Sequence, residues 1–420
     1  MRILVVGAGG REHAIVRALR RSPSAPELLC APGNPGIGAD ARLCEVAVGD
    51  VDGLVTLARA ESADLVVVGP EAPLVAGLVD ALAAAGIAAF GPVRGAARLE
   101  GSKEFAKEVM EAADVPTAAW SAVDSVDEGM AAIERFPIVL KFDGLAAGKG
   151  VVIAQDEAQA REALGAFLEQ RRFGPGRVVV EEHLEGEELS LLALCDGERA
   201  LPMAPAQDYK RIFDGDKGPN TGGMGSYSPV PGIDADRVRE ISALVHQPIV
   251  DELARRGTPF HGVLYAGLML TPGGPKVLEY NARFGDPETQ AVLPRLRSDL
   301  AELTLAATRP GGLAGLELDW DPRVAVTLVL ASAGYPDSPR TGDAITGLDA
   351  VPPGIEVTHA GTAFESGRLV TSGGRVLNVT ALGDTPAEAR AAAYAAADAV
   401  EFAGRQLRRD IALRAEERTT

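Results

Sequence analysis

The sequence predicts an α/β region at the amino end, followed by two α+β regions. Residues 1 to about 101 alternate short apolar runs with Ala- and Leu-rich helical stretches, whereas strand-like runs dominate from 102 to 320. A Gly- and Pro-rich stretch at 310–321 then precedes further strands and one Ala-rich helix. The length of 420 residues fits several domains, because one hydrophobic core usually serves fewer residues.

The amino-terminal region has the βαβ order of a Rossmann-like parallel sheet. Its apolar runs lie at 3–6, 28–31 and 65–68, and its helices are expected from residue 12 and near 52–60. A turn rich in glycine and proline follows each run, at 7–10, 32–36 and 69–71. Because the carboxyl ends of parallel strands meet at one edge of a sheet, these turns predict a ligand crevice there.

The two later regions are predicted from strand-like runs and helix signals. In the middle region the runs lie at 138–142, 150–154, 178–182, 265–270 and 276–280, and Ser102 is placed to cap a helix. The last region has runs at 324–330 and 376–379, a helix from residue 386 and a charged tail at 405–420. We expect this tail to form a solvated helix that frays.

Composition limits the partners and the location of the chain. With 41 basic and 59 acidic residues the formal charge is −18, which argues against binding to nucleic acid or an anionic membrane. No apolar stretch is long enough to cross a bilayer, and the first residues are typical of a buried strand rather than a signal peptide. Cys30, Cys44 and Cys195 lack CxxC spacing, so we expect buried, reduced thiols in a cytoplasmic protein.

The first glycine turn, Gly7-Ala-Gly-Gly10-Arg-Glu-His13, partly matches a dinucleotide fingerprint. Glu12 stands where the fingerprint needs its third glycine, and no acid follows the second strand to bind ribose hydroxyls, so a nicotinamide cofactor is disfavoured. The backbone of Gly9 and Gly10, beside Arg11, could instead bind a phosphate of a small substrate. The motif alone fits equally well with glycines that only permit the turn.

A second glycine loop, from Lys141 to Gly150, joins two strand-like runs. Its spacing excludes a Walker A loop, which needs GxxxxGK followed by Ser or Thr. It could fold over a triphosphate, because glycine frees backbone N–H groups and Lys141 and Lys149 supply positive charge. A flexible hairpin would explain the glycines but not the two lysines.

Two further segments carry acidic or metal-binding side chains. The acid-rich segment at 178–188 could meet an adenine edge and ribose hydroxyls, although a solvated loop explains it better when taken alone. At 276–288, strand alternation puts Glu279, Asn281 and Arg283 on one face, and Leu278 and Tyr280 on the other. Two oxygen ligands beside a guanidinium predict Mg²⁺ bridging ATP phosphates, whereas the alternative is an edge strand with a polar face.

Together these segments resemble the ATP-grasp enzymes, and among them the phosphoribosylamine-glycine ligase family. The resemblance runs through nearly the whole chain, in motifs at 7–13, 31–34, 68–74, 99–103, 143–150, 207–211, 218–225 and 281–290. Several of these motifs are weak alone, but their combination in this order is highly specific. Phe142 departs from the family, which often has a small residue there, and this puts the local packing of the loop in question.

The resemblance implies an organisation and a reaction. Residues 1–101 would form the Rossmann-like domain, 102–320 an ATP-grasp core of two subdomains with a lid at about 117–190, and 321–420 a small α+β domain. The enzyme would join glycine to 5-phosphoribosylamine through glycyl phosphate, in purine biosynthesis, using ATP and Mg²⁺ or Mn²⁺. A monomer with small-molecule substrates, and with neither nucleic acid nor membrane as a partner, is expected.

The resemblance also implies a role for individual residues. ATP would be bound by Lys103, Lys141, Gly148, Lys149, Gly150, Glu181, Glu182, Leu184 and Glu188. Glu279 and Asn281 would hold the metal ion, and the catalytic set would be Arg283, Lys210 and Asp208. The two other substrates would contact Gly9, Gly10, Arg11, Asn34, Glu71, Asn220, Asp286, Pro287 and Arg375.

Two alternatives remain on the sequence alone. A sister ATP-grasp enzyme that uses bicarbonate or formate would keep Lys141, Glu279 and Asn281 but would change the segments at 218–225 and 283–288. A nucleotide-sensing protein without catalysis would bind ATP but release no ADP. Glycine-dependent release of ADP distinguishes both alternatives from the ligase.

Overall fold

The amino-terminal sheet is parallel, as its βαβ pattern predicts. In the computed structural model, which describes residues 1–146 and 149–418, its strands are β1 (Arg2–Gly7), β2 (Glu27–Pro32), β3 (Arg42–Leu43), β4 (Leu65–Val68) and β5 (Ala89–Phe90). They pair in the order β3-β2-β1-β4-β5. Ile3 aligns with Leu28 on one side and Leu65 on the other, and all three are buried. The Rossmann-like prediction is confirmed.

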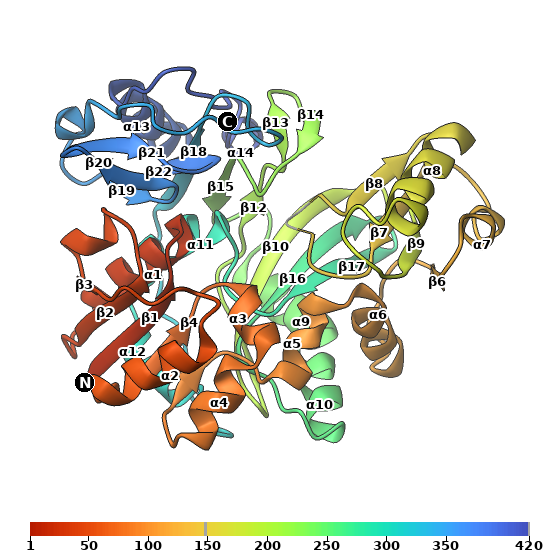
Figure 1. The fold of residues 1–420 in the computed structure, drawn as a ribbon, viewed down its shortest axis with the longest axis horizontal. Helices are drawn as coiled ribbons and strands as arrows, with labels where there is room; N and C mark the ends of the chain where they lie inside the picture. The colour runs from red at the N-terminus through yellow and green to blue at the C-terminus, as the bar shows by residue number, and fades with distance from the viewer. Residues whose placement is uncertain (147–148, 419–420) are drawn as a thin grey trace.

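The helices of this region surround the parallel sheet (Figure 1). They are α1 (Gly10–Arg20), α2 (Val51–Ala60), α3 (Glu71–Ala76), α4 (Leu78–Ala84) and α5 (Arg94–Gly101). Helix α1 begins two residues earlier than predicted, because the Glu12 carboxylate caps it by accepting from the Gly9 N–H at 2.6 Å. A Cβ at Gly7 or Gly69 would meet the Glu12 side chain at 2.3 or 2.2 Å. The acid that breaks the dinucleotide fingerprint therefore has a structural role.

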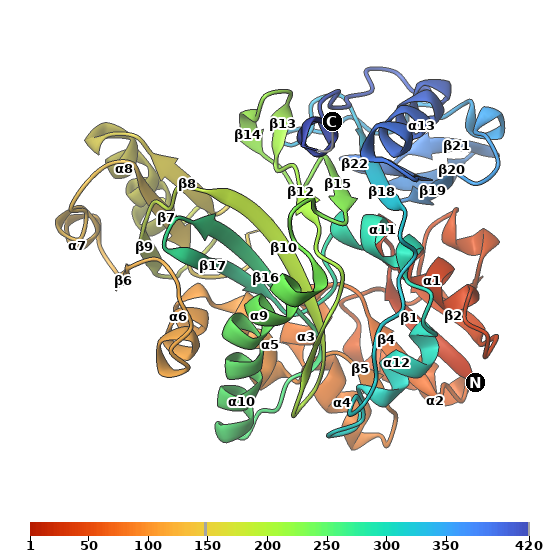
Figure 2. The same ribbon diagram turned by 180° about the vertical axis from the view of Figure 1, so that it is seen from behind.

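The central sheet is antiparallel and supports the cavity described below. Its strands are β10 (Glu187–Asp196), β11 (Ala200–Pro202), β16 (His261–Thr271) and β17 (Gly274–Asn281), in the order β11-β10-β16-β17. The register of β16 with β17 shifts between Gly267 and Leu268. Gly267 pairs with Glu279 and Leu268 with Val277, so Leu278 forms a β-bulge. Helices α6 (Lys103–Ala112), α9 (Ala235–Val245) and α10 (Gln247–Arg255) lie beside this sheet, and Ser102 caps α6 as predicted (Figure 2).

A small four-stranded sheet stands at one end of the molecule in both views (Figures 1 and 2). Its strands are β6 (Trp120–Val123), β7 (Ile138–Phe142), β8 (Val151–Ala154) and β9 (Val178–Glu182), in the order β6-β9-β7-β8, with α7 (Val126–Ala131) and α8 (Glu157–Leu164) alongside. Strands β7 and β8 are antiparallel, as predicted for the loop between them. Phe142 packs against Phe167 and Phe173 at ring distances of 6.2 and 5.5 Å, so an aromatic cluster accommodates it.

A third antiparallel sheet combines strands from distant parts of the chain. Its strands are β12 (Gln207–Asp208), β15 (Gly225–Ser228), β18 (Val324–Ala331), β19 (Glu356–His359) and β22 (Arg375–Gly383), in the order β12-β15-β18-β22-β19. The remaining elements are the hairpins β13 (Arg211–Phe213) with β14 (Lys217–Asn220) and β20 (Thr362–Glu365) with β21 (Arg368–Thr371), and the helices α11 (Glu288–Val292), α12 (Leu300–Ala306) and α13 (Pro386–Ala399). In the described part of the chain, no helix is long and apolar enough to cross a membrane.

The charged tail differs from the solvated helix that the sequence predicts. Within its described residues, 405–418, only α14 (Leu413–Glu417) is α-helical, and the Gln406 N–H donates to the Ala331 carbonyl at 2.8 Å. The Arg408 side chain is fully buried, 2.6 Å from Asp410 and 2.9 Å from Asp216, with its guanidinium over the Tyr209 ring. The prediction was wrong because these carboxylates and the ring compensate the burial of a charged side chain.

Arg408→Met is expected to lower the free energy of unfolding by about 2–3 kcal/mol, because it removes several charge-assisted hydrogen bonds to partly buried partners. Chemical denaturation would measure this loss. The neighbouring Arg409 has a side chain that is 52% exposed, so Arg409→Met is the matched control. It should lower the free energy of unfolding by less than about 1 kcal/mol. Equal denaturation midpoints for the two variants would contradict the role given to Arg408.

Two histidines join the amino-terminal sheet region to β19. The His359 N–H donates to His13 Nδ1 at 2.8 Å, and the Asn34 side-chain amide donates to the carbonyls of Ala8 and His359, both at 2.8 Å. Burial, then the neighbouring His13 and Arg17, lowers the pKa of His359 to about 4. Burial also lowers the pKa of His13, against the opposing effect of Asp40.

Stability is therefore expected to fall in mild acid. A folded-state pKa below the ordinary value of 6.5 means that protons bind the unfolded chain first, so stability is full above pH 6.5 and declines as the pH falls toward 4. Urea unfolding at pH 7.5 and pH 5 would measure the decline. The loss of unfolding free energy between these two pH values should be about 2 kcal/mol smaller in His359→Gln than in the wild type. An identical decline in wild type and variant would rule out His359 as the cause.

Candidate active site

A cavity of about 580 Å³ lies where the small four-stranded sheet, the central sheet and the third antiparallel sheet meet helices α5 and α6. It is lined by elements from every region of the chain, including α5, α6, β9, β16 and β17. Most of the site residues predicted from the sequence line it: Arg11, Glu71, Lys103, Lys141, Gly150, Glu181, Glu182, Leu184, Glu188, Asp208, Lys210, Asn220, Glu279, Asn281, Arg283, Asp286 and Arg375. Residues from opposite ends of the sequence, such as Arg11 and Arg375, thus share one site.

Other predicted residues are not among those that line this cavity. A Cβ at Gly10 would meet the Asn378 side chain at 2.1 Å. The Asn34 amide nitrogen donates to two backbone carbonyls, and its oxygen accepts from the Ile37 N–H. Gly9 donates to Glu12, Pro287 packs close to Gly223, and Lys149 lines a second cavity of about 470 Å³. Gly148 lies outside the described residues.

The start of α6 is bound to the loop after β7. The Asp143 carboxylate accepts from the Lys103 N–H at 2.6 Å, and Lys103 Nζ donates to the Gly144 carbonyl at 3.0 Å. Burial lowers the pKa of Lys103, partly opposed by Glu279. The lysine side chain is thereby fixed at the cavity wall without a carboxylate partner of its own in a hydrogen bond.

Strand β17 presents the predicted metal ligands to the cavity. Glu279 and Asn281 both line it, but Leu278 and Tyr280, which were expected on the opposite face, line it as well. Leu278 lies at the bulge, and its carbonyl accepts from Lys141 Nζ at 2.8 Å. Tyr280 is buried, and its hydroxyl donates to the Val245 carbonyl. Burial raises the pKa of Glu279, but Lys210, Lys141 and Lys103 outweigh it and the net pKa lies below its usual value.

These two side chains fit Mg²⁺ better than a metal bound by protein alone. Within residues 1–146 and 149–418, no group of three or more His, Cys, Asp or Glu is placed to hold a metal ion. One ionised carboxylate and one amide oxygen are the incomplete ligand set that Mg²⁺ completes with water and substrate phosphates.

Arg283 follows β17 and is held by two acids. Its Nη2 lies 2.7 Å from Glu100 Oε1, and its Nε lies 3.4 Å from Glu71 Oε2. Glu100 also accepts from the Ala282 N–H at 2.7 Å. Burial alone would lower the pKa of Arg283, but Glu100 and Glu71 raise it above its ordinary value. The sequence interpretation missed Glu100, although it lies in the motif at 99–103.

A second polar group lies at the edge of β12. Lys210 Nζ is 3.0 Å from Glu188 Oε2, and burial together with Glu288 and Glu188 raises the pKa of Asp208 against the opposing effect of Lys210. Glu288 accepts from the hydroxyls of Tyr265 at 3.0 Å and Ser190 at 3.2 Å. Glu288 lies in a quoted motif, whereas Tyr265, inside an apolar strand, gave no sequence signal.

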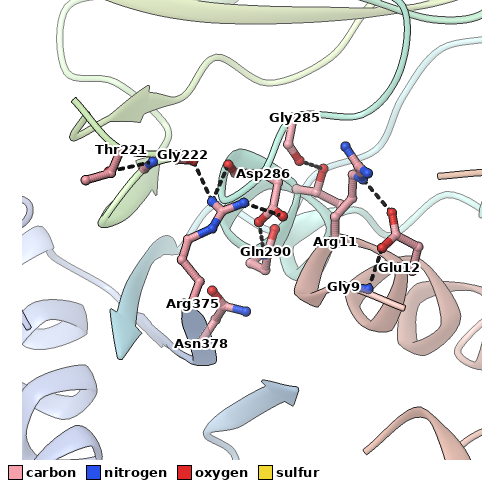
Figure 3. A network of polar contacts seen from close by, with 12 residues as sticks. Gly9, Arg11, Glu12, Thr221, Gly222, Gly285, Asp286, Gln290, Arg375 and Asn378 are labelled. Carbon is pink, nitrogen blue, oxygen red and sulfur yellow. Dashed lines mark hydrogen bonds and ion pairs between the residues drawn. The ribbon is translucent and has the colours of Figure 1, made fainter. Parts of the chain in front are cut away.

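Arg375 connects the third sheet to the loop before α11 (Figure 3). It binds Asp286 through the carboxylate and the main-chain carbonyl, both at 2.8 Å, and it donates to the Gly222 carbonyl. Gln290 donates to the other carboxylate oxygen at 2.7 Å. On the opposite side Arg11 lies between Glu12 and the Phe284 carbonyl. Three parts of the chain are thus joined at one wall of the cavity.

Family models match all three parts of the chain. The descriptions are phosphoribosylglycinamide synthetase N domain at residues 1–100, ATP-grasp (A) domain at 101–289 and C domain at 325–414. The chain belongs to the phosphoribosylglycinamide synthetase family. The family predicted from the motifs, and the ligase class, are confirmed.

Individual relatives match the chain over nearly its full length. A phosphoribosylamine–glycine ligase of Streptomyces coelicolor is 53% identical over 99% of both chains, and one of Caldanaerobacter subterraneus is 47% identical over 98% of this chain and 99% of its own. The crystal structure of phosphoribosylamine–glycine ligase from Thermotoga maritima has 37% identity and a TM-score of 0.86, covering 98% of this chain and 100% of its own. Biotin carboxylase of Campylobacter jejuni, at 15% identity and a TM-score of 0.75 over 99% and 95% of the two chains, shares the fold.

Proposed function

We propose that the chain joins glycine to 5-phosphoribosylamine, with conversion of ATP to ADP and phosphate, giving glycinamide ribonucleotide for purine biosynthesis. The observation that carries this proposal is the convergence of Glu279, Asn281 and Arg283 with Lys103 and Lys141 in one cavity. Sequence relatives named for this reaction over the whole chain length support it. ATP activates the glycine carboxylate as glycyl phosphate, and the amine of phosphoribosylamine then displaces phosphate.

In this proposal ATP lies between the small four-stranded sheet, which acts as the lid, and the central sheet. Lys103 and Lys141 neutralise its phosphates. Glu181, Glu182 and Leu184, at the end of β9, contact the adenine, and Glu188 contacts the ribose. Glu181 does so through its main chain, because its side chain is buried. Gly150 and the predicted Gly148 and Lys149 belong to the loop that covers the phosphates.

Glu279 and Asn281 would hold Mg²⁺ or Mn²⁺, whose charge, when bound, offsets that of the phosphates. Arg283 stabilises the transferring phosphoryl group, since its guanidinium stays charged in the buried site. Lys210, Asp208 and Asn220 orient glycine beside it. These residues position charges rather than form covalent bonds, as phosphoryl transfer requires.

The acceptor half of the site lies toward the amino-terminal and third sheets. Glu71, Arg11, Asp286 and Arg375 line that side of the cavity and are proposed to bind phosphoribosylamine. Asp286 and Arg375 already pair with each other, so the amine or the phosphate of the substrate would exchange with part of this contact. Gly9, Gly10, Asn34 and Pro287 would then act by shaping this wall.

The domain boundaries, location and assembly state are part of the same proposal. We assign residues 1–101, 102–320 and 321–420 to three domains, place the reaction in the cytoplasm and expect a monomer. Three buried free thiols are compatible with a reducing compartment. Light scattering of the purified chain at micromolar concentration tests the monomer.

ADP release with phosphoribosylamine generated in place tests the reaction. The rate should depend on glycine and should not respond to bicarbonate or formate. Turnover that ignored glycine but required bicarbonate or formate would assign the chain to a sister ATP-grasp reaction. Tight ATP binding without glycine-dependent ADP release would make it a nucleotide-binding protein.

A further inference from the structure

Three buried ionic side chains lie together in the wall of the proposed ATP site. Lys107 of α6 and Glu181 of β9 are each 2% exposed, and Lys141 of β7 is 6% exposed. One carboxylate oxygen, Glu181 Oε2, lies 3.1 Å from Lys107 Nζ and 2.9 Å from Lys141 Nζ. Two lysines therefore share one carboxylate oxygen, and the cluster has a net charge of +1.

The surroundings fix Lys107 firmly in place. Its ammonium donates to Thr117 Oγ1 at 2.8 Å, and this hydroxyl donates to the Val277 carbonyl on β17 at 2.6 Å. Lys141 uses another N–H for the Leu278 carbonyl on the same strand. The cluster thus joins the lid strands β7 and β9 to the central sheet and to α6, and Figure 2 shows these elements meeting at the base of the lid.

The charge count indicates why a second lysine is needed. A buried Glu181 with Lys141 alone would form a neutral pair, and the carboxylate would hold the Lys141 ammonium against itself. With Lys107 on the same oxygen, Glu181 is already compensated, so the charge of Lys141 remains available to a phosphate. Glu181 Oε1 accepts no hydrogen bond from the described residues, so both lysines meet the carboxylate at its other oxygen.

We propose that Lys107 is a positioning residue for nucleotide binding: by sharing Glu181 with Lys141, it keeps the Lys141 charge available for the ATP phosphates. In this inference Lys107, which lines the same cavity, acts through Glu181 and not through a hydrogen bond of its own to a phosphate. This inference rests on the proposed ATP site. No role in binding was assigned to Lys107 from the sequence motifs.

The test is ATP affinity, measured by calorimetry with Mg²⁺ and without glycine. Lys107→Met should weaken ATP binding roughly ten-fold, the order of one charge-assisted hydrogen bond, while kcat at saturating ATP stays within about two-fold. Lys107→Met/Glu181→Gln restores the net charge of +1 and should recover most of the affinity. Lys217→Met, an exposed lysine outside both cavities, is the control and should bind as wild type.

A pH series gives a second readout that a merely structural role would not move. Burial, opposed by Glu181 and reinforced by Lys141 and Lys276, lowers the pKa of Lys107 to about 8. Wild-type ATP affinity should therefore fall as the pH rises above 8, because the cluster loses its extra charge. The fall should be absent in Lys107→Met and in the double variant, and Lys107→Arg should move it beyond the measured range.

The outcomes separate the two proposals. If Lys107→Met binds ATP as wild type does, or if the double variant binds more weakly than the single one, the positioning role is wrong. If Lys107→Met does not fold, the double variant and the wild-type pH series decide the question. Loss of glycine-dependent ADP release in the wild type would overturn the proposed reaction while leaving the ATP titrations interpretable.

Discussion

Glu279→Gln is expected to lower the rate of glycine-dependent ADP release by about 10³-fold or more without unfolding the chain. The substitution keeps the size of the side chain but removes the only ionised carboxylate of the proposed metal pair. Lys103, Lys141, Lys210 and Arg283 surround Glu279, so the site would keep its positive charge while losing a ligand for Mg²⁺. Activity and Mg²⁺-dependent ATP binding should both fall.

The control for this variant is Glu302→Gln, an exposed glutamate on α12 that should leave ADP release unchanged. Circular dichroism and a thermal melt check that Glu279→Gln folds. Near wild-type turnover at ordinary Mg²⁺ concentration would refute the metal assignment. Slow turnover that responds normally to Mg²⁺ would instead assign Glu279 an electrostatic role.

Arg283→Met is expected to lower both activity and stability. Activity should fall by about 10³-fold or more, because an arginine that faces a transferring phosphoryl group carries an effect of this size. The free energy of unfolding should fall by about 3–5 kcal/mol, because a buried Glu100 would be left without its cation. The burial that already raises the pKa of Glu100 would then act unopposed by its main partner.

A double variant separates these two effects. Arg283→Met/Glu100→Gln removes the unpaired carboxylate and should regain most of the stability, measured by urea denaturation. It should remain inactive, because no guanidinium faces the reacting groups. If activity returned together with stability, Arg283 would act by holding the fold and not on the reaction.

The metal and phosphate half of the site could be predicted because its chemistry lies in contiguous segments. Glu279 and Asn281 lie on β17 and Arg283 follows two residues after its end, so the two-residue spacing of a strand was enough to group them. The bulge at Leu278 could not be predicted, since it depends on how β17 pairs with β16. The sharing of the Glu181 carboxylate by two lysines could not be predicted either, because Lys107 and Lys141 come from different elements that only tertiary packing brings together.

The acceptor half was harder to predict for a related reason. A glycine turn such as the one at Gly10 equally allows ligand approach or close packing, and here the space beside it is taken by Asn378 from the third sheet. The Asn34 amide nitrogen likewise donates to two backbone carbonyls instead of facing the cavity. The tail prediction failed because Arg408 pairs with Asp216, nearly 200 positions earlier in the chain. A run of charged residues gives no sign of such a long-range ion pair.

The composition of the third sheet has a consequence for the order in which the protein is made. Strands β12 and β15 leave the ribosome long before β18 and β22. In the finished sheet β12 pairs with β15, β15 with β18 and β18 with β22. The nascent middle segment therefore carries an unpaired strand edge until about a hundred further residues have been synthesised, the situation in which chaperones protect growing chains. The Gly222 carbonyl accepts from Arg375 of β22, so this contact at the cavity wall can form only after β22 has been made.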